Sequence, residues 1–170
     1  HTSAGRVPTQ KAYRFFVDKM ELSIDGHKNP AYKKLQSEMR GAIAASPTQA
    51  SQLLAQRLAE LSGSLAFVGL LGLNRIYKEG LAQLLNEPEF EDAEAIRGLL
   101  AYMESLEHRL TDLSRAISGN VCVTIGENPL PFSLIAFSHE LPNSDRGVFG
   151  LVGPMRTRYS ENLALLDSVR

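Results

Sequence analysis

The sequence predicts an α+β fold in which a sheet domain with packed helices follows an N-terminal pair of helices. Three observations support this prediction. Apolar residues recur at helical spacing through the first 62 residues, four apolar runs of strand length follow Gly63, and helical patterns lie between and after those runs. The chain has 170 residues, of which 44% are hydrophobic, so it is long enough to bury a substantial core.

Three amphipathic helices are expected before Gly63. Thr9 is predicted to cap the first helix, which ends at Asp25-Gly26 and carries an apolar stripe formed by Tyr13, Phe16, Val17 and Met20. The second helix is expected to begin at Asn29-Pro30, because proline suits the first helical turn. The third is expected to begin at Ser46, because Ser46 and Gln49 have the spacing of a capping box. The first two helices form the predicted N-terminal pair.

Strand patterns begin after Gly63. The continuous apolar run at residues 64–71 predicts a strand that is covered on both faces. Residues 80–118 return to a helical pattern, with a break at Pro88. The remaining expected elements are strands at 121–125, 132–138 and 147–152 and a closing helix from Thr157 onward. The turn-rich residues 142–146 are expected to join the last two strands as a hairpin.

Charge and cysteine content exclude several classes of protein. Cys122 is the single cysteine, which excludes a disulfide framework and a cysteine-based zinc site. The net charge is -1, although residues 1–40 hold eight basic and four acidic side chains. A solvated helix face explains this local excess better than direct contact with DNA. Since no apolar run is long enough to cross a membrane, we expect a cytoplasmic protein without a membrane partner.

The sequence contains no convincing catalytic or metal-binding constellation. Ser138-His139-Glu140 has the residue types of a catalytic triad, but neighbours on a strand point to opposite faces. Glu104 and His108 lie one helical turn apart, and a surface ion pair is the ordinary explanation of that spacing. We therefore predict that the chain is not an enzyme and needs no cofactor or metal.

A loop near the C-terminus is a candidate anion site or interface. It runs from Gly153 to Arg158 and precedes the expected closing helix, which begins near Tyr159. Free amide groups at the helix start, together with Arg156 and Arg158, have the chemistry to receive an anion. A plain turn between strand and helix is the alternative, and it remains open at this point.

Four segments in order along the chain together resemble the HrcA family of bacterial heat-inducible transcription repressors. They are HTSAGRVPTQKAYRFFVD at 1–18, GLAQLLNEPEFED at 80–92, IGENPL at 125–130 and VFGLVGPMRTRY at 148–159. The resemblance spans nearly the whole chain. It implies a helical linker at 1–45 and a GAF-like α+β domain at 46–170.

The resemblance also implies a place in a larger repressor. In that family the first segment directly follows a winged helix-turn-helix domain, so the resemblance puts the junction with a DNA-binding domain at His1, Thr2, Ser3, Gly5 and Arg6. It further implies a homodimer that binds an inverted-repeat operator through that domain and represses chaperone operons. The chaperonin is a candidate partner that favours the active repressor.

The sequence departs from the family pattern after the first strand. Family members carry an inserted dimerisation module there, whereas here nine residues separate Leu71 from Leu81. A dimer must then use the GAF-like surface or the N-terminal helices, where Tyr13, Phe16, Val17 and Met20 are the candidate packing residues. The alternative function is a GAF-like small-molecule sensor, with a pocket lined by strand residues such as Thr124, Ser133 and Ser138.

Overall fold

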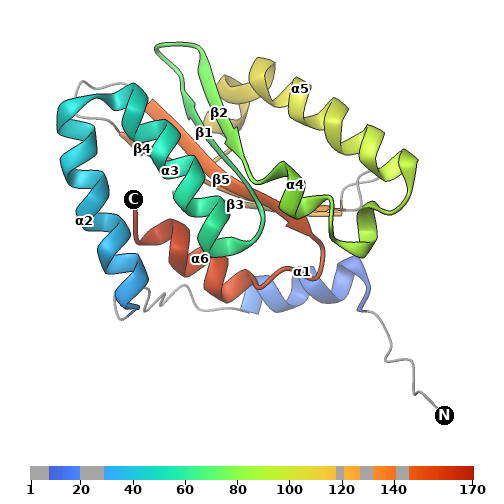
Figure 1. Ribbon diagram of the computed structural model, residues 1–170. Helices are drawn as coiled ribbons and strands as arrows, with labels where there is room; N and C mark the ends of the chain where they lie inside the picture. Colours follow the sequence, from blue (N-terminus) through green and yellow to red (C-terminus); the bar gives the residue numbers. More distant parts are fainter. Residues whose placement is uncertain (1–7, 20–28, 118–120, 127–131, 141–145) are drawn as a thin grey trace.

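The protein is built around one five-stranded antiparallel sheet with the strand order β2-β1-β5-β4-β3. The computed structural model describes residues 8–19, 29–117, 121–126, 132–140 and 146–170. The strands are β1 (Leu65–Leu70), β2 (Arg75–Glu79), β3 (Val121–Ile125), β4 (Phe132–Glu140) and β5 (Arg146–Pro154). Helices cover both faces of the sheet, so the molecule has three layers (Figure 1).

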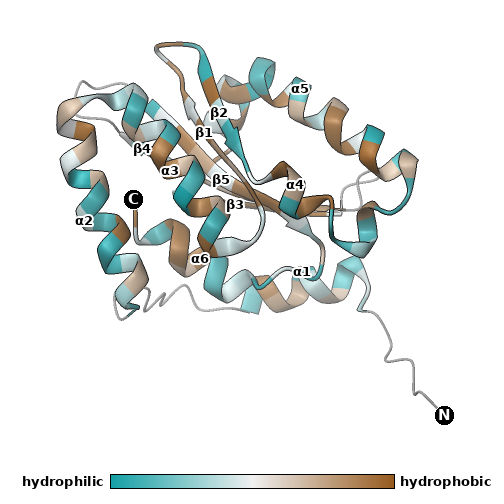
Figure 2. Ribbon diagram, in the orientation of Figure 1, coloured by the Kyte–Doolittle hydropathy of each residue, from teal (hydrophilic) through white to brown (hydrophobic). Residues whose placement is uncertain are grey.

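The helices divide between the two faces of the sheet. One face carries α1 (Gln10–Lys19), α2 (Pro30–Ala45), α3 (Pro47–Ser62) and α6 (Tyr159–Asp167). The other carries α4 (Leu81–Leu84), the 3-10 helix η2 (Pro88–Phe90) and α5 (Ala93–Ala116). Apolar residues are concentrated along the strands and hydrophilic residues on the outer sides of α2 and α5 (Figure 2). Each face therefore has its own hydrophobic cluster.

The predicted helix starts are confirmed by their capping contacts. The Thr9 hydroxyl accepts a hydrogen bond from the Ala12 amide at 3.3 Å, and the Ser46 hydroxyl accepts one from the Gln49 amide at 3.4 Å. The Asn29 side chain accepts from the Ala31 amide at 2.9 Å. These bonds satisfy amide groups that have no partner inside the helix. The predicted end of the first helix at Asp25-Gly26 lies outside the described residues.

Strand β1 confirms the prediction of a strand covered on both faces. All six of its residues are buried, between α3 on one side and α5 on the other. β4 and β5 pair antiparallel from Phe132–Pro154 to Glu140–Arg146, as the expected hairpin requires. The break at Pro88 is also confirmed, because η2 separates α4 from the long helix α5.

Strand β2 is an element that the sequence analysis did not predict. It forms a hairpin with β1, and the short connection after Leu70 closes through a bond from the Asn74 amide to the Leu71 carbonyl at 3.1 Å. Asn74 adopts the left-handed backbone conformation with φ 47, which asparagine tolerates better than most residues. The strand is half-exposed at the sheet edge and polar, so it lacks the apolar run that identifies a covered strand.

The apolar stripe predicted for α1 is only partly correct. Tyr13 and Val17 pack against the core cluster, but the Phe16 side chain is 55% exposed, and Met20 lies outside the described residues. The reason is geometric: residues four apart lie on one side of a helix, so the face that contains Tyr13 and Val17 turns Phe16 toward the edge. Phe16 therefore does not take part in the packing of α1 on the sheet.

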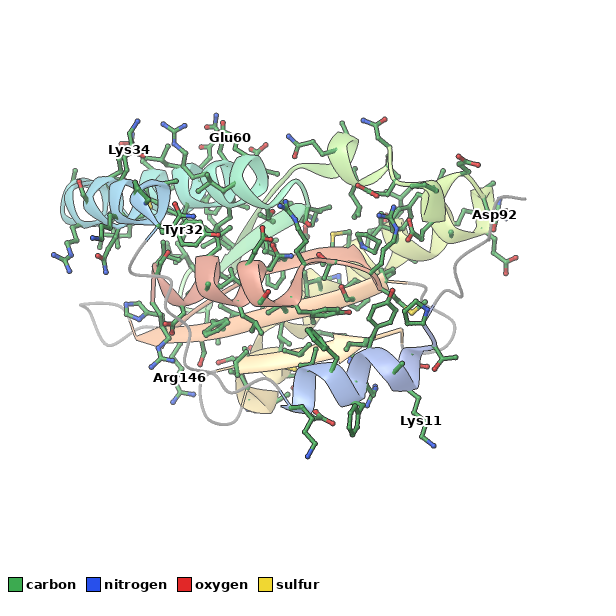
Figure 3. All side chains as sticks on the ribbon, turned by 90° about the horizontal axis from the view of Figure 1, so that it is seen from below. Lys11, Tyr32, Lys34, Glu60, Asp92 and Arg146 are labelled. Atoms are coloured by element: carbon green, nitrogen blue, oxygen red, sulfur yellow. The ribbon has the colours of Figure 1, made fainter. Side chains whose placement is uncertain are left out.

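Helix α2 shares the core of the sheet domain. Leu35 and Met39 are buried in the same cluster as Leu58 of α3 and Leu163 of α6. Figure 3 shows Tyr32 between α2 and α6, where its hydroxyl donates to the Glu161 carbonyl at 3.4 Å. The division between a linker at 1–45 and a domain at 46–170 stays a prediction.

Among the described residues, no helix has both the length and the apolar character that a membrane span requires.

Candidate functional site

The four segments that resemble the repressor family meet at one end of the sheet. We call this region the motif junction and define it by residues from each segment: Gln10 and Tyr13; Glu87 and Glu89; Ile125 and Gly126; Met155, Arg156 and Tyr159. These residues are far apart in the chain, and direct contacts bring them together. In Figure 1, α1 runs below the sheet.

The first two turns of α1 are fixed to the sheet by one hydrogen bond and one ring contact. The Gln10 side-chain amide donates to the Ile125 carbonyl at 2.6 Å. Tyr13 lies against Tyr159 with ring centroids 6.1 Å apart and ring planes tilted by 45°. Tilted aromatic pairs at this separation are favourable. Because β3 is the last strand of the sheet, the bond from Gln10 also satisfies a carbonyl at an open edge.

Arg156 ties the loop after β5 to the segment between α4 and α5. Its guanidinium donates to Glu89 at 2.7 Å and 3.2 Å and to Glu87 at 2.5 Å. The hydrogen bond to Glu89 is the largest cause of the raised pKa of Arg156, and Glu87 adds to it. A guanidinium shared by two carboxylates fixes the orientation of both segments. This contact joins the second resembling segment to the fourth.

The candidate anion site is occupied by the carboxylates of the protein itself. Arg156 binds Glu87 and Glu89, and Arg158 binds Glu161 at 2.8 Å. An external anion would have to displace these partners. The geometry therefore favours the alternative, a turn between strand and helix whose two arginines serve internal contacts.

Close packing at the junction requires glycine at Gly126. Its φ is 54, and a Cβ placed there would lie 2.5 Å from the Met155 sulfur and 3.5 Å from Gln10. Gly153 is also tightly packed, since an added Cβ would lie 3.1 Å from the Ser64 hydroxyl oxygen. The Ser133 hydroxyl donates to the Gly153 carbonyl at 3.3 Å and to the Pro154 carbonyl at 3.1 Å. The end of the sheet is thus tightly packed around the loop.

Tyr159 is the buried centre of the junction. Only 3% of its surface is exposed, and its hydroxyl donates to the Met155 carbonyl at 2.7 Å. Burial raises the pKa of Tyr159 to about 12, and the nearby Ser133 hydroxyl opposes this rise. The phenol must therefore remain neutral for the junction to keep its packing.

The burial of Tyr159 predicts a loss of stability at alkaline pH. The ordinary pKa of tyrosine is 10.0 and the pKa of Tyr159 in the folded protein is about 12. The contribution of neutral Tyr159 to the free energy of unfolding is therefore complete below pH 10 and is lost as the pH rises toward 12. Two units correspond to about 2 to 3 kcal/mol. Urea unfolding of the wild type and of Tyr159→Phe, at about pH 9 and about pH 11.5, measures this loss of stability. The variant is expected to lose less stability over this interval, and an equal loss in both proteins would contradict the assignment.

Several residues singled out in the sequence lie away from the junction. Ser138 and His139 are consecutive in β4, so their side chains leave opposite faces of the sheet. Glu104 and His108 lie one turn apart on the exposed side of α5. Within the described ranges, no group of three His, Cys, Asp or Glu side chains has metal-binding geometry. The predicted junction residues His1, Thr2, Ser3, Gly5 and Arg6 lie outside the described residues.

Sequence reasoning missed four residues that build the junction: Gln10, Glu87, Glu89 and Gly126. All four lie inside the resembling segments, which was the available signal. Their contacts could not be predicted from the sequence. An acidic residue does not indicate which arginine it will bind, because the fold brings the two together.

The three-layer arrangement defines an α+β domain of the GAF-like type. A crystal structure of a hypothetical protein superimposes with a TM-score of 0.66 at 15% sequence identity, covering 99% of this chain and 78% of that chain. This likeness shows the fold, and it agrees with the predicted fold class.

Sequence comparison then identifies the family. The family model of the HrcA protein C terminal domain matches residues 23–162. The heat-inducible transcription repressor HrcA of Moorella thermoacetica is 29% identical over 100 residues, which cover 56% of this chain and 29% of that protein. HrcA of Natranaerobius thermophilus is 35% identical over 95 residues, which cover 53% of this chain and 27% of that protein. The chain belongs to the HrcA family of heat-inducible transcription repressors, which are transcription regulators and not enzymes. The matched region spans less than a third of the length of these relatives.

Proposed function

We propose that this chain is the regulatory and dimerising part of a cytoplasmic repressor that negatively controls chaperone operons. In this proposal an N-terminal winged helix-turn-helix domain binds an inverted-repeat operator, and residues 1–45 connect that domain to the GAF-like part. The family membership supports the class of regulator. The dimer, the operator and the chaperonin as partner are parts of the proposal.

The observation that carries the proposal is the docking of α1 at the motif junction. The Gln10 bond to β3 and the contact between Tyr13 and Tyr159 hold the start of α1 against the sheet. A helix held in this way fixes the direction in which the preceding residues leave the domain. A dimeric reader of two half-sites needs a fixed separation, and a docked helix supplies this better than a flexible linker.

The short β1–β2 hairpin bears on where a dimer would form. Residues 71–74 turn directly into β2, at the place where the family resemblance implies an inserted dimerisation module. Phe15 and Phe16 on the outer side of α1 are 65% and 55% exposed. Exposed large apolar residues are typical of interaction surfaces. We therefore place the candidate dimer contact on α1, with Phe16 as one of its members.

The proposal is tested with the complete reading frame that contains this chain. We expect this reading frame to encode a winged helix-turn-helix domain before His1. Its product is expected to sediment as a dimer. In a gel-shift experiment it should retard an inverted-repeat operator fragment from upstream of a chaperone operon. The 170-residue chain alone is the control and should leave the fragment unretarded. A reading frame with a different domain at this place, or a product that remains monomeric and ignores the operator, would refute the proposal.

A further inference from the structure

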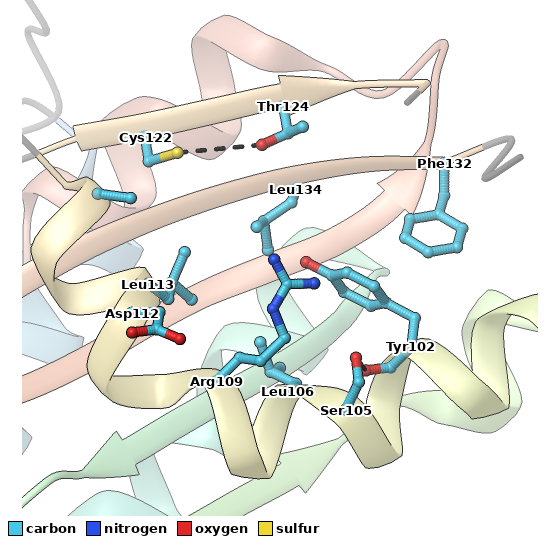
Figure 4. A pocket seen from close by; sticks show the side chains of 11 residues that line it. Tyr102, Ser105, Leu106, Arg109, Asp112, Leu113, Cys122, Thr124, Phe132 and Leu134 are labelled. Carbon is cyan, nitrogen blue, oxygen red and sulfur yellow. Dashed lines mark hydrogen bonds between the residues drawn. The ribbon is translucent and has the colours of Figure 1, made fainter. Parts of the chain in front are cut away.

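A cavity of about 380 Å³ lies between α5 and the edge of the sheet, away from the motif junction. We call it the α5 pocket. Its walls come from α5, through Tyr102, Leu106 and Arg109, and from β3 and β4, through Thr124, Phe132 and Leu134 (Figure 4). The volume lies in the range of small-molecule sites. The pocket exists because α5 packs over the centre of the sheet and leaves part of β3 and β4 uncovered on this face.

The β3 sequence VCVTI is consistent with a pocket on this face. Side chains alternate between the two faces of this strand. On the face that α1 and α6 cover lie Val121, Val123 and Ile125, whereas Cys122 and Thr124 face the pocket. The side that packs against helices is branched and apolar, and the side that faces the pocket is small and polar. A sealed core would favour apolar residues on both sides.

The pocket has an apolar floor and a polar mouth. Leu106, Phe132 and Leu134 are almost fully buried and form the floor. Tyr102 packs edge-on against Phe132 with ring centroids 5.0 Å apart, and Figure 4 shows its hydroxyl and the Arg109 guanidinium pointing toward one another over the cavity. A ligand that fits this arrangement has an apolar body and one polar head.

The charge at the mouth favours a single negative charge on that head. Arg109 is the one cation in the lining, and within the described part of the chain no carboxylate pairs with it. Asp112 also lines the pocket, but it lies 3.6 Å from Arg115 on the outer side of α5. A planar guanidinium binds a carboxylate through two parallel hydrogen bonds, whereas a doubly charged phosphate beside Asp112 would meet repulsion.

We propose that the α5 pocket binds a small apolar carboxylic acid. Arg109 holds the carboxylate, and the apolar body lies on Leu106, Phe132 and Leu134. Binding to the folded state alone stabilises that state, so the ligand raises the melting temperature, and above the dissociation constant the stabilisation grows with the logarithm of the ligand concentration.

The test uses octanoate and 3-phenylpropanoate as probes of the intact chain, with octanamide as the neutral analogue. Calorimetric titration is expected to give a dissociation constant below about 1 mM for at least one acid. Arg109→Gln should weaken that acid by at least about tenfold and leave octanamide unchanged. Arg97→Gln, a change at an exposed arginine of the same helix outside the pocket, is the matched control and should bind like the wild type.

A second variant tests the pocket independently, in case Arg109→Gln fails to fold. Thr124→Leu fills the pocket with a larger side chain, keeps strand character and should reduce binding of each acid that the wild type binds, while the circular dichroism spectrum stays the same. The proposal is overturned if neither acid binds at about 10 mM. Equal binding of the acid by wild type and Arg109→Gln would also overturn it, because the interaction would then be general hydrophobic association.

Discussion

Replacement of Gly150 by alanine is expected to lower the free energy of unfolding by about 3 kcal/mol and the melting temperature by roughly 6 to 12 °C. Gly150 lies in β5, the central strand, between Phe67 on β1 and Ala136 on β4. An added Cβ would overlap the Ile135 carbonyl oxygen and would lie 2.9 Å from the Phe67 ring. Neither group can move freely, because one is backbone in a paired strand and the other is a fully buried ring.

Thermal and urea unfolding measure this effect, and Gly41→Ala is the matched control. Gly41 lies inside α2, and an added Cβ there meets no atom within 4 Å. Alanine favours a helix interior over glycine by roughly 0.5 to 1 kcal/mol, so this variant is expected to gain stability. The same chemical change should therefore act in opposite directions at the two sites. A small effect at Gly150 would mean that the strands separate more easily than their packing indicates.

The elements with strong apolar patterns were predictable from the sequence. The β1 run, the β3 run and the cap at Ser46 fall within one residue of their observed positions. Their signals are local, because burial on two faces gives a continuous apolar run and a cap bonds an amide three residues away. β2 was missed for the opposite reason: Arg75 and Lys78 are compatible with an exposed edge, and the pairing partner Leu65–Leu70 is what makes the segment a strand.

The candidate site was predictable in its segments but not in its contacts. The family resemblance singled out the segments that contain Gln10, Gly126 and Arg156. Nothing local indicates that Arg156 would select Glu87 and Glu89, since the three residues meet only after β5 crosses the sheet. The stripe on α1 failed at Phe16 for a related reason. Helical periodicity defines a broad apolar sector, and the sheet decides which part of that sector is covered.

In the proposed repressor, the docking of α1 is the feature that connects this domain to operator binding. If the proposed operator-binding domain precedes α1, the contacts of Gln10 and Tyr13 set how far apart the two domains of a dimer lie. The second half-site is then bound through effective concentration, which requires that the geometry permits simultaneous contact. With a mobile α1, each DNA-binding domain could still bind its own half-site. The added affinity from binding both half-sites at once would decline.

Release of α1 is therefore expected to weaken operator binding by about 100-fold in the complete repressor. The double variant Tyr13→Ala, Val17→Ala removes both side chains that pack α1 on the core, and a gel-shift titration with an operator of two half-sites measures the change. Tyr13→Phe keeps the ring against Tyr159 and should bind like the wild type, as should Ala12→Gln at an exposed position of the same turn. Hydrogen exchange verifies that α1 is released. Wild-type affinity in a repressor with a released α1 would show that the helix does not set the spacing, and a single half-site should show no loss in any variant.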